Sequence, residues 1–202
     1  LVNDMLNISR IEGGRIALRL SETDLIDLSK EVELEVAAKA GEKNITVHIV
    51  PSEIPKVFCD RDKIHEVLLN LIGNSLKFTK ADGNIYVGFS YDQSYVKCTV
   101  RDTGVGISAE NIGRLFAKFG RLENSYVAVA ESGGTGLGLF ICKSLVEFHK
   151  GVISAESPGV GLGTTFSFTL PISGTPAAKQ LENEAPRETG ETKDLEKTNI
   201  NL

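Results

Sequence analysis

The sequence lacks an excess of basic residues: 22 lysines and arginines stand against 27 aspartates and glutamates, and the net charge is −5. Without that excess we expect no nucleic acid and no anionic membrane surface as a partner. The sequence also lacks an apolar run that approaches the ~20 residues needed to cross a bilayer. Because residues 1–6 read as the middle of a helix, we expect a fragment of a longer chain. The lack of a membrane-spanning run here therefore says nothing about the rest of that chain.

Cysteine is scarce as well. Each of the three cysteines, Cys59, Cys98 and Cys142, lies among apolar neighbours, and no two of them form a CxxC pair. This spacing does not fit a zinc site. We therefore expect buried free thiols in a reducing compartment.

What is present is ordinary for a globular protein, with 41% hydrophobic and 24% charged residues over 202 positions. Residues 173–202 differ, because they contain no aromatic residue and are rich in Glu, Lys, Thr, Asn and Pro. Such a segment buries too little apolar area to offset its ordering entropy. We therefore divide the chain into a helix end over 1–14, one domain over 15–172 and a disordered polar tail over 173–202.

Hydrophobic periodicity predicts the elements of the central domain. Helices are expected over residues 24–40, 61–79 and 137–149, and strands over 15–20, 45–50, 57–60, 85–91, 95–101, 152–157 and 164–170. Several of the strands are joined by tight hairpins, and the order is not a steady alternation of strand and helix. This pattern predicts an α/β fold, a two-layer sandwich in which helices pack on one face of a mixed, mostly antiparallel sheet.

The helix expected over 61–79 combines a strongly apolar face with a polar stripe. The stripe contains Glu66, Asn70, Asn74 and Lys77, which are spaced by four, four and three residues. A solvated face explains most such stripes, but asparagine is a mediocre helix former. Its amide oxygen is, however, a good neutral ligand for a hard cation. The two asparagines therefore favour a binding role over simple solvation.

Two glycine clusters flank expected elements: residues 102–107 follow a strand, and residues 133–139 precede a helix. Glycines let a backbone approach a ligand closely, and the amides of a helix N-terminus bind phosphate. Neither cluster fits the Rossmann fingerprint, and no Lys-Ser/Thr pair follows as a P-loop requires. The two standard phosphate-binding patterns are thereby excluded.

The combination of these motifs is more specific than any one of them. An Asn-x-x-x-Asn helix (residues 65–79), Asp-x-Gly-x-Gly (102–107), Phe-x-x-Phe (115–121) and Gly-Thr-Gly-Leu-Gly (134–139) follow one another in this order. The chain thus resembles the catalytic, ATP-binding domain of sensor histidine kinases within the GHKL ATPase superfamily, whose fold is the Bergerat-type ATP-binding sandwich. The resemblance covers about residues 24–171, and residues 9–14 resemble the end of the preceding phosphoacceptor-domain helix.

The resemblance implies a role for each matching residue toward ATP and Mg²⁺. Asn74 would ligate Mg²⁺ with support from Asn70, Lys77 would reach the phosphates, and Asp102 would accept the adenine amino group. Gly104 and Gly106 would turn beneath the base, Arg121 in a lid over 108–135 would contact the γ-phosphate, and Gly134, Gly136 and Gly138 would wrap the phosphates. The remaining motif members implied to line the nucleotide site are Phe78, Ile107, Phe119, Thr135, Leu137 and Leu139.

The residue at position 70 separates the kinases of this superfamily from its ATPases. The related ATPases carry a glutamate there to activate water, whereas Asn70 cannot take a proton at neutral pH. Glu66, one turn earlier, can still polarise an incoming imidazole. We therefore expect a histidine kinase catalytic domain, with a GHKL-type ATPase and a nucleotide-binding but inactive sensor module as the alternatives.

The phosphoacceptor histidine is not expected among the three histidines present. His48 lies in a strand pattern, His65 beside the start of a helix, and His149 at a helix end, where we read it as structural. We therefore expect an acceptor upstream of Leu1, on helices of the same or a partner subunit of a homodimeric parent. A response regulator receiver domain is the implied downstream partner. We expect this fragment to be cytoplasmic, while the sequence leaves membrane anchoring of the parent open.

Overall fold

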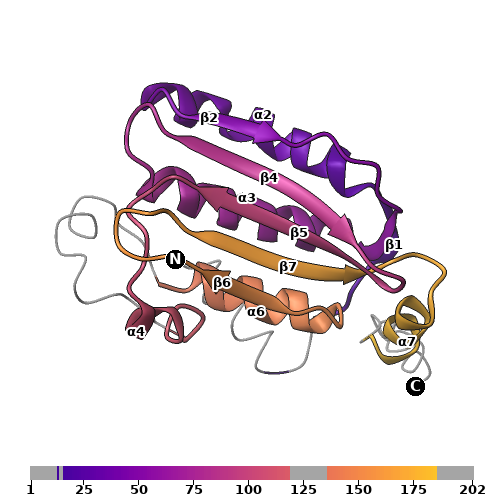
Figure 1. Cartoon of the computed structure of the whole chain (residues 1–202). Coiled ribbons are helices and arrows are strands. Elements are labelled where there is room, and N and C mark those ends of the chain that lie inside the picture. The colour runs from indigo at the N-terminus through magenta and orange to yellow at the C-terminus, as the bar shows by residue number, and fades with distance from the viewer. Residues whose placement is uncertain (1–12, 14–15, 119–135, 186–202) are drawn as a thin grey trace, which may run out of the picture.

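The computed structural model describes residues 13, 16–118 and 136–185 (Figure 1). Its strands are β1 (Leu20–Thr23), β2 (Thr46–Ile49), β3 (Val57–Asp60), β4 (Asn84–Tyr91), β5 (Tyr95–Asp102), β6 (Ile153–Glu156) and β7 (Thr165–Pro171). Its helices are α2 (Leu25–Glu42), α3 (Arg61–Phe78), α4 (Ala109–Ile112), α6 (Gly138–Phe148) and α7 (Pro176–Glu184).

Five of the strands form one sheet in the order β2-β4-β5-β7-β6. The β2 strand runs parallel to β4, and the other three pairings are antiparallel. Helices α2, α3 and α6 lie together behind this sheet in Figure 1. The predicted two-layer α/β sandwich with a mostly antiparallel sheet is therefore confirmed.

Helix α3 lies at the centre of the helical layer, between α2 and α6. Its N-terminus is capped by Asp60, whose carboxylate accepts hydrogen bonds from the amides of Asp62 and Lys63. Its apolar side chains are almost fully buried, as the periodicity predicted: Ile64, Val67, Leu68, Leu71, Ile72 and Leu76. Because this face is fixed against the sheet, the polar side chains at its border are held in place.

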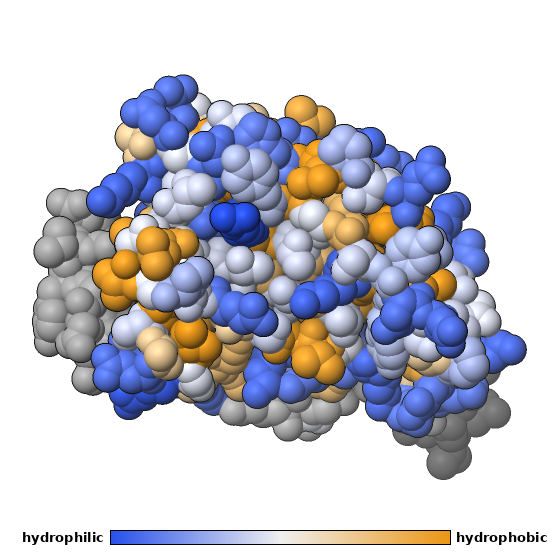
Figure 2. All heavy atoms as spheres, viewed as in Figure 1, coloured by the Kyte–Doolittle hydropathy of each residue, from blue (hydrophilic) through white to orange (hydrophobic). Residues whose placement is uncertain are grey.

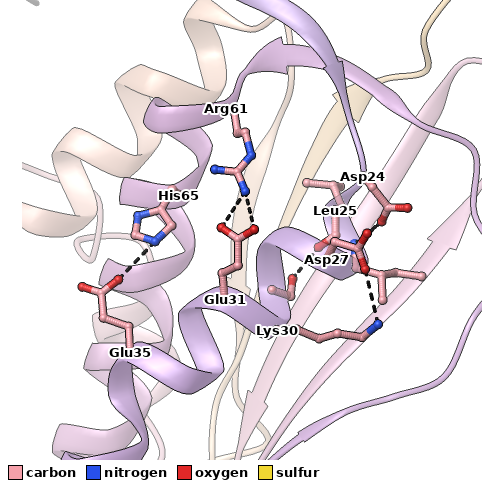
Figure 3. Close-up of polar contacts among 10 residues, drawn as sticks. Asp24, Leu25, Asp27, Lys30, Glu31, Glu35, Arg61 and His65 are labelled. Atoms are coloured by element: carbon pink, nitrogen blue, oxygen red, sulfur yellow. Dashed lines mark hydrogen bonds and ion pairs between the residues drawn. The ribbon is translucent and has the colours of Figure 1, made fainter.

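Helices α2 and α3 also meet through charged side chains at their exposed edges (Figure 3). Arg61 pairs with Glu31, and His65 Nε2 lies 3.1 Å from a Glu35 carboxylate oxygen. Such pairs on a protein surface contribute little stability, because water and salt screen them. The His65 ring therefore points toward Glu35 of α2 (Figure 3).

The opposite face of the sheet is open and mostly polar, with apolar side chains scattered over it (Figure 2). The imidazole of His48 stacks on the ring of Tyr86 across β2 and β4, with centroids 4.8 Å apart. Side chains that alternate with the buried ones along β4 and β5, such as Tyr86 and Lys97, face outward. The fold therefore has one core, between the sheet and the helices.

The strand predicted over residues 15–20 is wrong for residues 16–19, which lie outside any strand, because β1 begins only at Leu20. Ile16 and Leu18 are buried, so the alternation that suggested a strand reflects burial alone. The pairing of β1 with β3 begins at Leu20 opposite Asp60, which is the last residue of β3. Residues 16–19, which the structure describes directly before β1, therefore lie outside this pairing.

The disordered tail predicted from Ser173 is wrong for Pro176–Glu184, which form helix α7. Thr175 caps the helix through its hydroxyl, and Leu181 is fully buried in the hydrophobic core. Lys150, just after α6, forms an ion pair with Glu184 and thereby lowers the pKa of that carboxyl. Two apolar residues of α7, Ala178 and Leu181, are buried, and an average over this polar segment conceals them.

His149 is fully buried and structural, as predicted. Its Nε2 accepts a hydrogen bond of 2.9 Å from the amide of Asp60, and its Nδ1 lies 2.7 Å from the carbonyl of Leu145, to which it donates. Burial lowers the pKa of this imidazole below its ordinary value, since a charged ring cannot be hydrated there. One neutral imidazole thus joins the end of α6 to the start of α3.

The three cysteines are free and buried, as expected. Burial raises the pKa of Cys59 to about 11 and raises those of Cys98 and Cys142 as well, so thiolates do not form near neutral pH. In the part of the chain that the structure describes, no helix combines the length and the apolar character that a membrane span requires.

Candidate functional site

The polar stripe predicted on α3 lies along the border between core and solvent. Glu66, Asn70, Asn74 and Lys77 are all half-buried, while most of the residues between them belong to the buried face. Their positions are set by that face, because a helix that is fixed on one side cannot rotate the other. The stripe therefore has the partial burial expected of side chains that bind a ligand at a domain surface.

Asn70 lies against the first residue of α6. Its amide nitrogen donates a 2.9 Å hydrogen bond to the carbonyl of Glu66 in its own helix. Its amide oxygen is close to Gly138, where a Cβ atom would lie only 2.9 Å from it. Glycine at this position therefore lets α6 begin directly beside the amide oxygen of Asn70.

The start of α6 is suited to bind an anion. Leu137, its N-cap residue, is buried and provides no side-chain cap to the helix amides. Gly136 has a φ of 71°, in the left-handed region that favours glycine. The first amides of a helix carry a partial positive charge and point along its axis. A phosphate at this end would therefore meet hydrogen-bond donors next to the α3 stripe.

At the C-terminal end of α3, Lys77 and Phe78 interact with each other. The ammonium of Lys77 lies 5.1 Å from the centroid of the Phe78 ring, within range of a cation–π contact. The carbonyl of Phe78 accepts a 3.1 Å hydrogen bond from the amide of Val105. The end of α3 and the first glycine loop are therefore in direct contact.

Asp102 ends β5 as a buried carboxylate and is only 4% exposed. Its Oδ1 accepts hydrogen bonds from the amides of Gly104, at 2.8 Å, and Thr164, at 3.2 Å. Its Oδ2 accepts one from the Ser75 hydroxyl at 3.3 Å, and no second hydrogen bond reaches that oxygen from the described residues. Burial raises the pKa of this carboxyl, while these hydrogen bonds act to lower it. The second oxygen thus retains capacity for a donor from a ligand.

The loop after Asp102 packs on the loop between β6 and β7, backbone against backbone. Gly161 donates to the Val105 carbonyl at 2.6 Å, and Gly163 donates to the Gly104 carbonyl at 3.1 Å. The approach requires glycine at Gly163, because a Cβ atom there would lie 2.1 Å from the carbonyl oxygen of Asp102. The loop between β6 and β7 therefore helps to fix the position of the loop after Asp102.

The structure brings most of the predicted site residues together at one end of the sandwich. The members on α3, on the 102–107 loop and at the start of α6 are linked by the contacts given above. Ile107 and Leu139 are half-buried and pack against the core. Four predicted site residues lie outside the described residues: Phe119, Arg121, Gly134 and Thr135.

Sequence reasoning missed several residues around Asp102. Ser75 and Thr164 donate to its carboxylate, and Ser157 accepts a hydrogen bond from Ile107. Ser75 had a usable signal, since it adjoins Asn74 on a helix whose neighbouring face is apolar. The sequence gives no such signal for Thr164 or Ser157, because their positions beside Asp102 and Ile107 depend on how β7 and β6 align with β5.

Comparisons with known proteins point to one family. A family model for histidine kinase-, DNA gyrase B- and HSP90-like ATPases matches residues 59–174, more than half of the chain. An uncharacterized sensor-like histidine kinase of Rhizobium meliloti is 34% identical over 187 residues, which make up 92% of this chain and 35% of the relative. The chain spans between 12% and 35% of the length of such curated relatives.

Solved structures agree with that match. Full-length ShkA in complex with AMPPNP superposes with a TM-score of 0.74 at 30% identity, over 85% of this chain and 35% of that one. Histidine kinase ThkA in complex with response regulator TrrA gives a TM-score of 0.65 at 25% identity, over 85% of this chain and 48% of that one. The chain therefore belongs to the family of histidine kinase-, DNA gyrase B- and HSP90-like ATPases.

Proposed function

We propose that this chain is the catalytic domain of a sensor histidine kinase, which binds Mg-ATP and transfers its γ-phosphoryl group to a histidine on upstream dimerisation helices. In this transfer the bond from phosphorus to the β–γ bridging oxygen breaks, a bond to an imidazole nitrogen forms, and ADP remains. Phosphoryl transfer depends mainly on positioning and charge stabilisation, which the site residues can supply. The observation that carries the proposal is the buried carboxylate of Asp102.

Asp102 has the surroundings expected of a residue that recognises adenine. Two backbone amides occupy Oδ1, while Oδ2 accepts from Ser75 and retains an acceptor position. An amino group is a donor that can use this position, whereas guanine presents a carbonyl oxygen at the equivalent place. A buried carboxylate without a ligand is unfavourable, as its raised pKa indicates. A donor from the base would offset part of that cost.

The phosphates would lie between α3 and the start of α6. Lys77 supplies a positive charge, and the first amides of α6 supply donors. Among the residues described, no group of three or more His, Cys, Asp or Glu side chains could hold a metal ion. Mg²⁺ characteristically binds through one or two protein ligands together with phosphate oxygens and water. This preference fits Asn74 as the protein ligand, with Asn70 one turn away.

The side chains at positions 66 and 70 favour transfer to histidine over hydrolysis. Asn70 has no basic group, and its amide nitrogen is already engaged with the Glu66 carbonyl. The carboxylate of Glu66 lies 3.7 Å from the Lys63 ammonium and is about a third exposed, so an incoming imidazole can reach it. A water molecule in the place of the imidazole would lack an adjacent base where the ATPases have theirs.

The partners follow from this activity. The acceptor would be a phosphoacceptor helix of the same or the partner subunit in a homodimeric, cytoplasmic kinase module. The phosphoryl group would then pass to the receiver domain of a response regulator. That ThkA has been solved with the response regulator TrrA supports this choice of partner.

The test adds γ-labelled ATP and a separate protein that carries the phosphoacceptor helices. We expect labelled phosphohistidine on the acceptor, and none with an Asn74→Ala variant of this chain. Release of free phosphate alone would instead identify an ATPase. Nucleotide binding with neither product would identify an inactive sensor module.

A further inference from the structure

The contact between the 104–107 loop and the β6–β7 loop contains one side chain that belongs to neither glycine motif. Ser157 directly follows β6 and is half-buried. Its hydroxyl oxygen accepts a 3.0 Å hydrogen bond from the amide of Ile107. The same hydroxyl lies 2.7 Å from the carbonyl of Gly163, its nearest acceptor, to which it donates. Ser157 therefore joins the end of one loop to the end of the other.

The other hydrogen bonds between these loops, within the described residues, run between backbone groups. Gly161 reaches Val105, and Gly163 reaches Gly104, each through amide and carbonyl. Thr164, the residue after Gly163, donates its amide to the Asp102 carboxylate and accepts from the Asp102 amide at 2.8 Å. A change at Ser157 would therefore alter the spacing of both segments that hold Asp102.

We propose that Ser157 is a positioning residue for adenine recognition: its hydroxyl holds the 104–107 loop and Gly163 at the separation that presents Asp102 to the base. This inference rests on the proposed function. Ser157 acts on the base-binding end alone, because its hydrogen-bond partners are Ile107, Gly159 and Gly163. The phosphate-binding residues lie instead on α3 and α6. Its loss should therefore weaken nucleotide affinity and leave the rate of phosphoryl transfer at saturation unchanged.

The test compares Ser157→Ala with Ser157→Thr in the whole chain, by calorimetric titration with ADP and with GDP. Loss of the hydrogen bonds that the Ser157 hydroxyl makes with Ile107 and Gly163 should weaken ADP binding about tenfold, equivalent to about 1.4 kcal/mol. Threonine keeps the hydroxyl and should restore most of that affinity. GDP binding should change little, so the preference for ADP over GDP should fall in the alanine variant and recover in the threonine variant.

Ser29→Ala is the matched control, because Ser29 is a buried serine whose hydroxyl donates at 2.7 Å to the Leu25 carbonyl in α2, away from the site. It should leave ADP affinity unchanged. Should Ser157→Ala melt far below Ser29→Ala, Ser157→Cys fills the space of the hydroxyl with a somewhat larger thiol and replaces a strong acceptor with a weak one. It should then show the same loss of affinity.

Three results would overturn the inference. Equal ADP affinity in wild type, Ser157→Ala and Ser157→Cys would refute the role of Ser157 while leaving the proposed function intact. A wild-type chain that binds no ADP would refute the proposed function, and the role of Ser157 with it. A loss of affinity accompanied by an equal fall in turnover at saturating ATP, measured with the separate acceptor protein, would indicate general disruption and would also count against it.

Discussion

Replacing Asp102 with asparagine isolates its contact with the base better than any other substitution in the site. The asparagine Oδ1 can still accept from the Gly104 and Thr164 amides, which both bind Oδ1 of the native carboxylate. Its amide nitrogen takes the place of Oδ2, where the Ser75 hydroxyl can rotate to accept from it. The loop after β5 should therefore keep its shape while the acceptor for the adenine amino group becomes a donor.

The expected magnitude follows from the loss of one charge-assisted hydrogen bond, about 1.5–3 kcal/mol. This corresponds to a dissociation constant for ADP that is larger by roughly 10- to 150-fold. The folding stability of the Asp102→Asn variant, in contrast, should not fall and should rise at pH 7. Because burial raises the pKa of Asp102, its contribution to stability is full below the unfolded value of 3.8 and is lost as pH rises through the folded value. At pH 7 the ionised group is therefore a net cost, which the neutral amide removes.

Calorimetric titration with ADP measures the first effect, and thermal melting at pH 7 without nucleotide measures the second. We expect weaker binding together with a melting temperature equal to or above that of wild type. Unchanged affinity in a well-folded variant would refute adenine recognition by Asp102. A large drop in melting temperature would refute the expectation that the asparagine Oδ1 keeps the hydrogen bonds from the Gly104 and Thr164 amides.

Four further predictions concern single residues. Asn74→Ala should abolish the gain in ATP affinity that Mg²⁺ gives the wild type, so titrations with and without Mg²⁺ should coincide for the variant only. The free energy of unfolding, measured in urea, should fall as the pH drops below the ordinary histidine pKa of 6.5, because the folded state keeps the His149 imidazole neutral while the unfolded chain binds a proton there. A His149→Gln variant should show a shallower pH dependence of this free energy. Leu181→Ala should lower stability by about 2–4 kcal/mol, whereas Lys179→Ala on the exposed side of α7 should change it by less than ~0.5 kcal/mol. Gly163→Ala should destabilise by at least about 1 kcal/mol, since its φ is 77° and its Cβ would meet the Asp102 carbonyl, whereas Gly41→Ala, with open space in α2, should be neutral or stabilising.

Helix α3 shows what local sequence can predict. Its expected span of 61–79 differs by one residue from the observed Arg61–Phe78, and every residue of its predicted apolar face is buried. The apolar residues of such a helix repeat over several turns, so the helix can be predicted without knowing which elements it packs against. The polar stripe could be located for the same reason, since it is fixed relative to the apolar face.

The missed features all depend on contacts between distant segments. Ser157 and Ile107 are separated by 50 residues, and Thr164 and Asp102 by 62. Their meeting is set by the register of β5 with β7, in which Arg101 lies opposite Thr165. Nothing in either segment specifies that alignment, so their partners could not be inferred from motifs. The β1 error has the same origin, because a strand extends only as far as its partner does.

The pairing of β5 with β7 also has a consequence for protein synthesis. Tyr95 pairs with Pro171 and Arg101 with Thr165, so these neighbouring strands come from well-separated parts of the chain. A nascent polypeptide that has left the ribosome only as far as β5 carries Asp102 without Thr164 or the glycines beside it. The hydrogen bonds between Asp102 and Thr164 therefore form only after β7 has been translated and has paired with β5, and shorter translation products lack them.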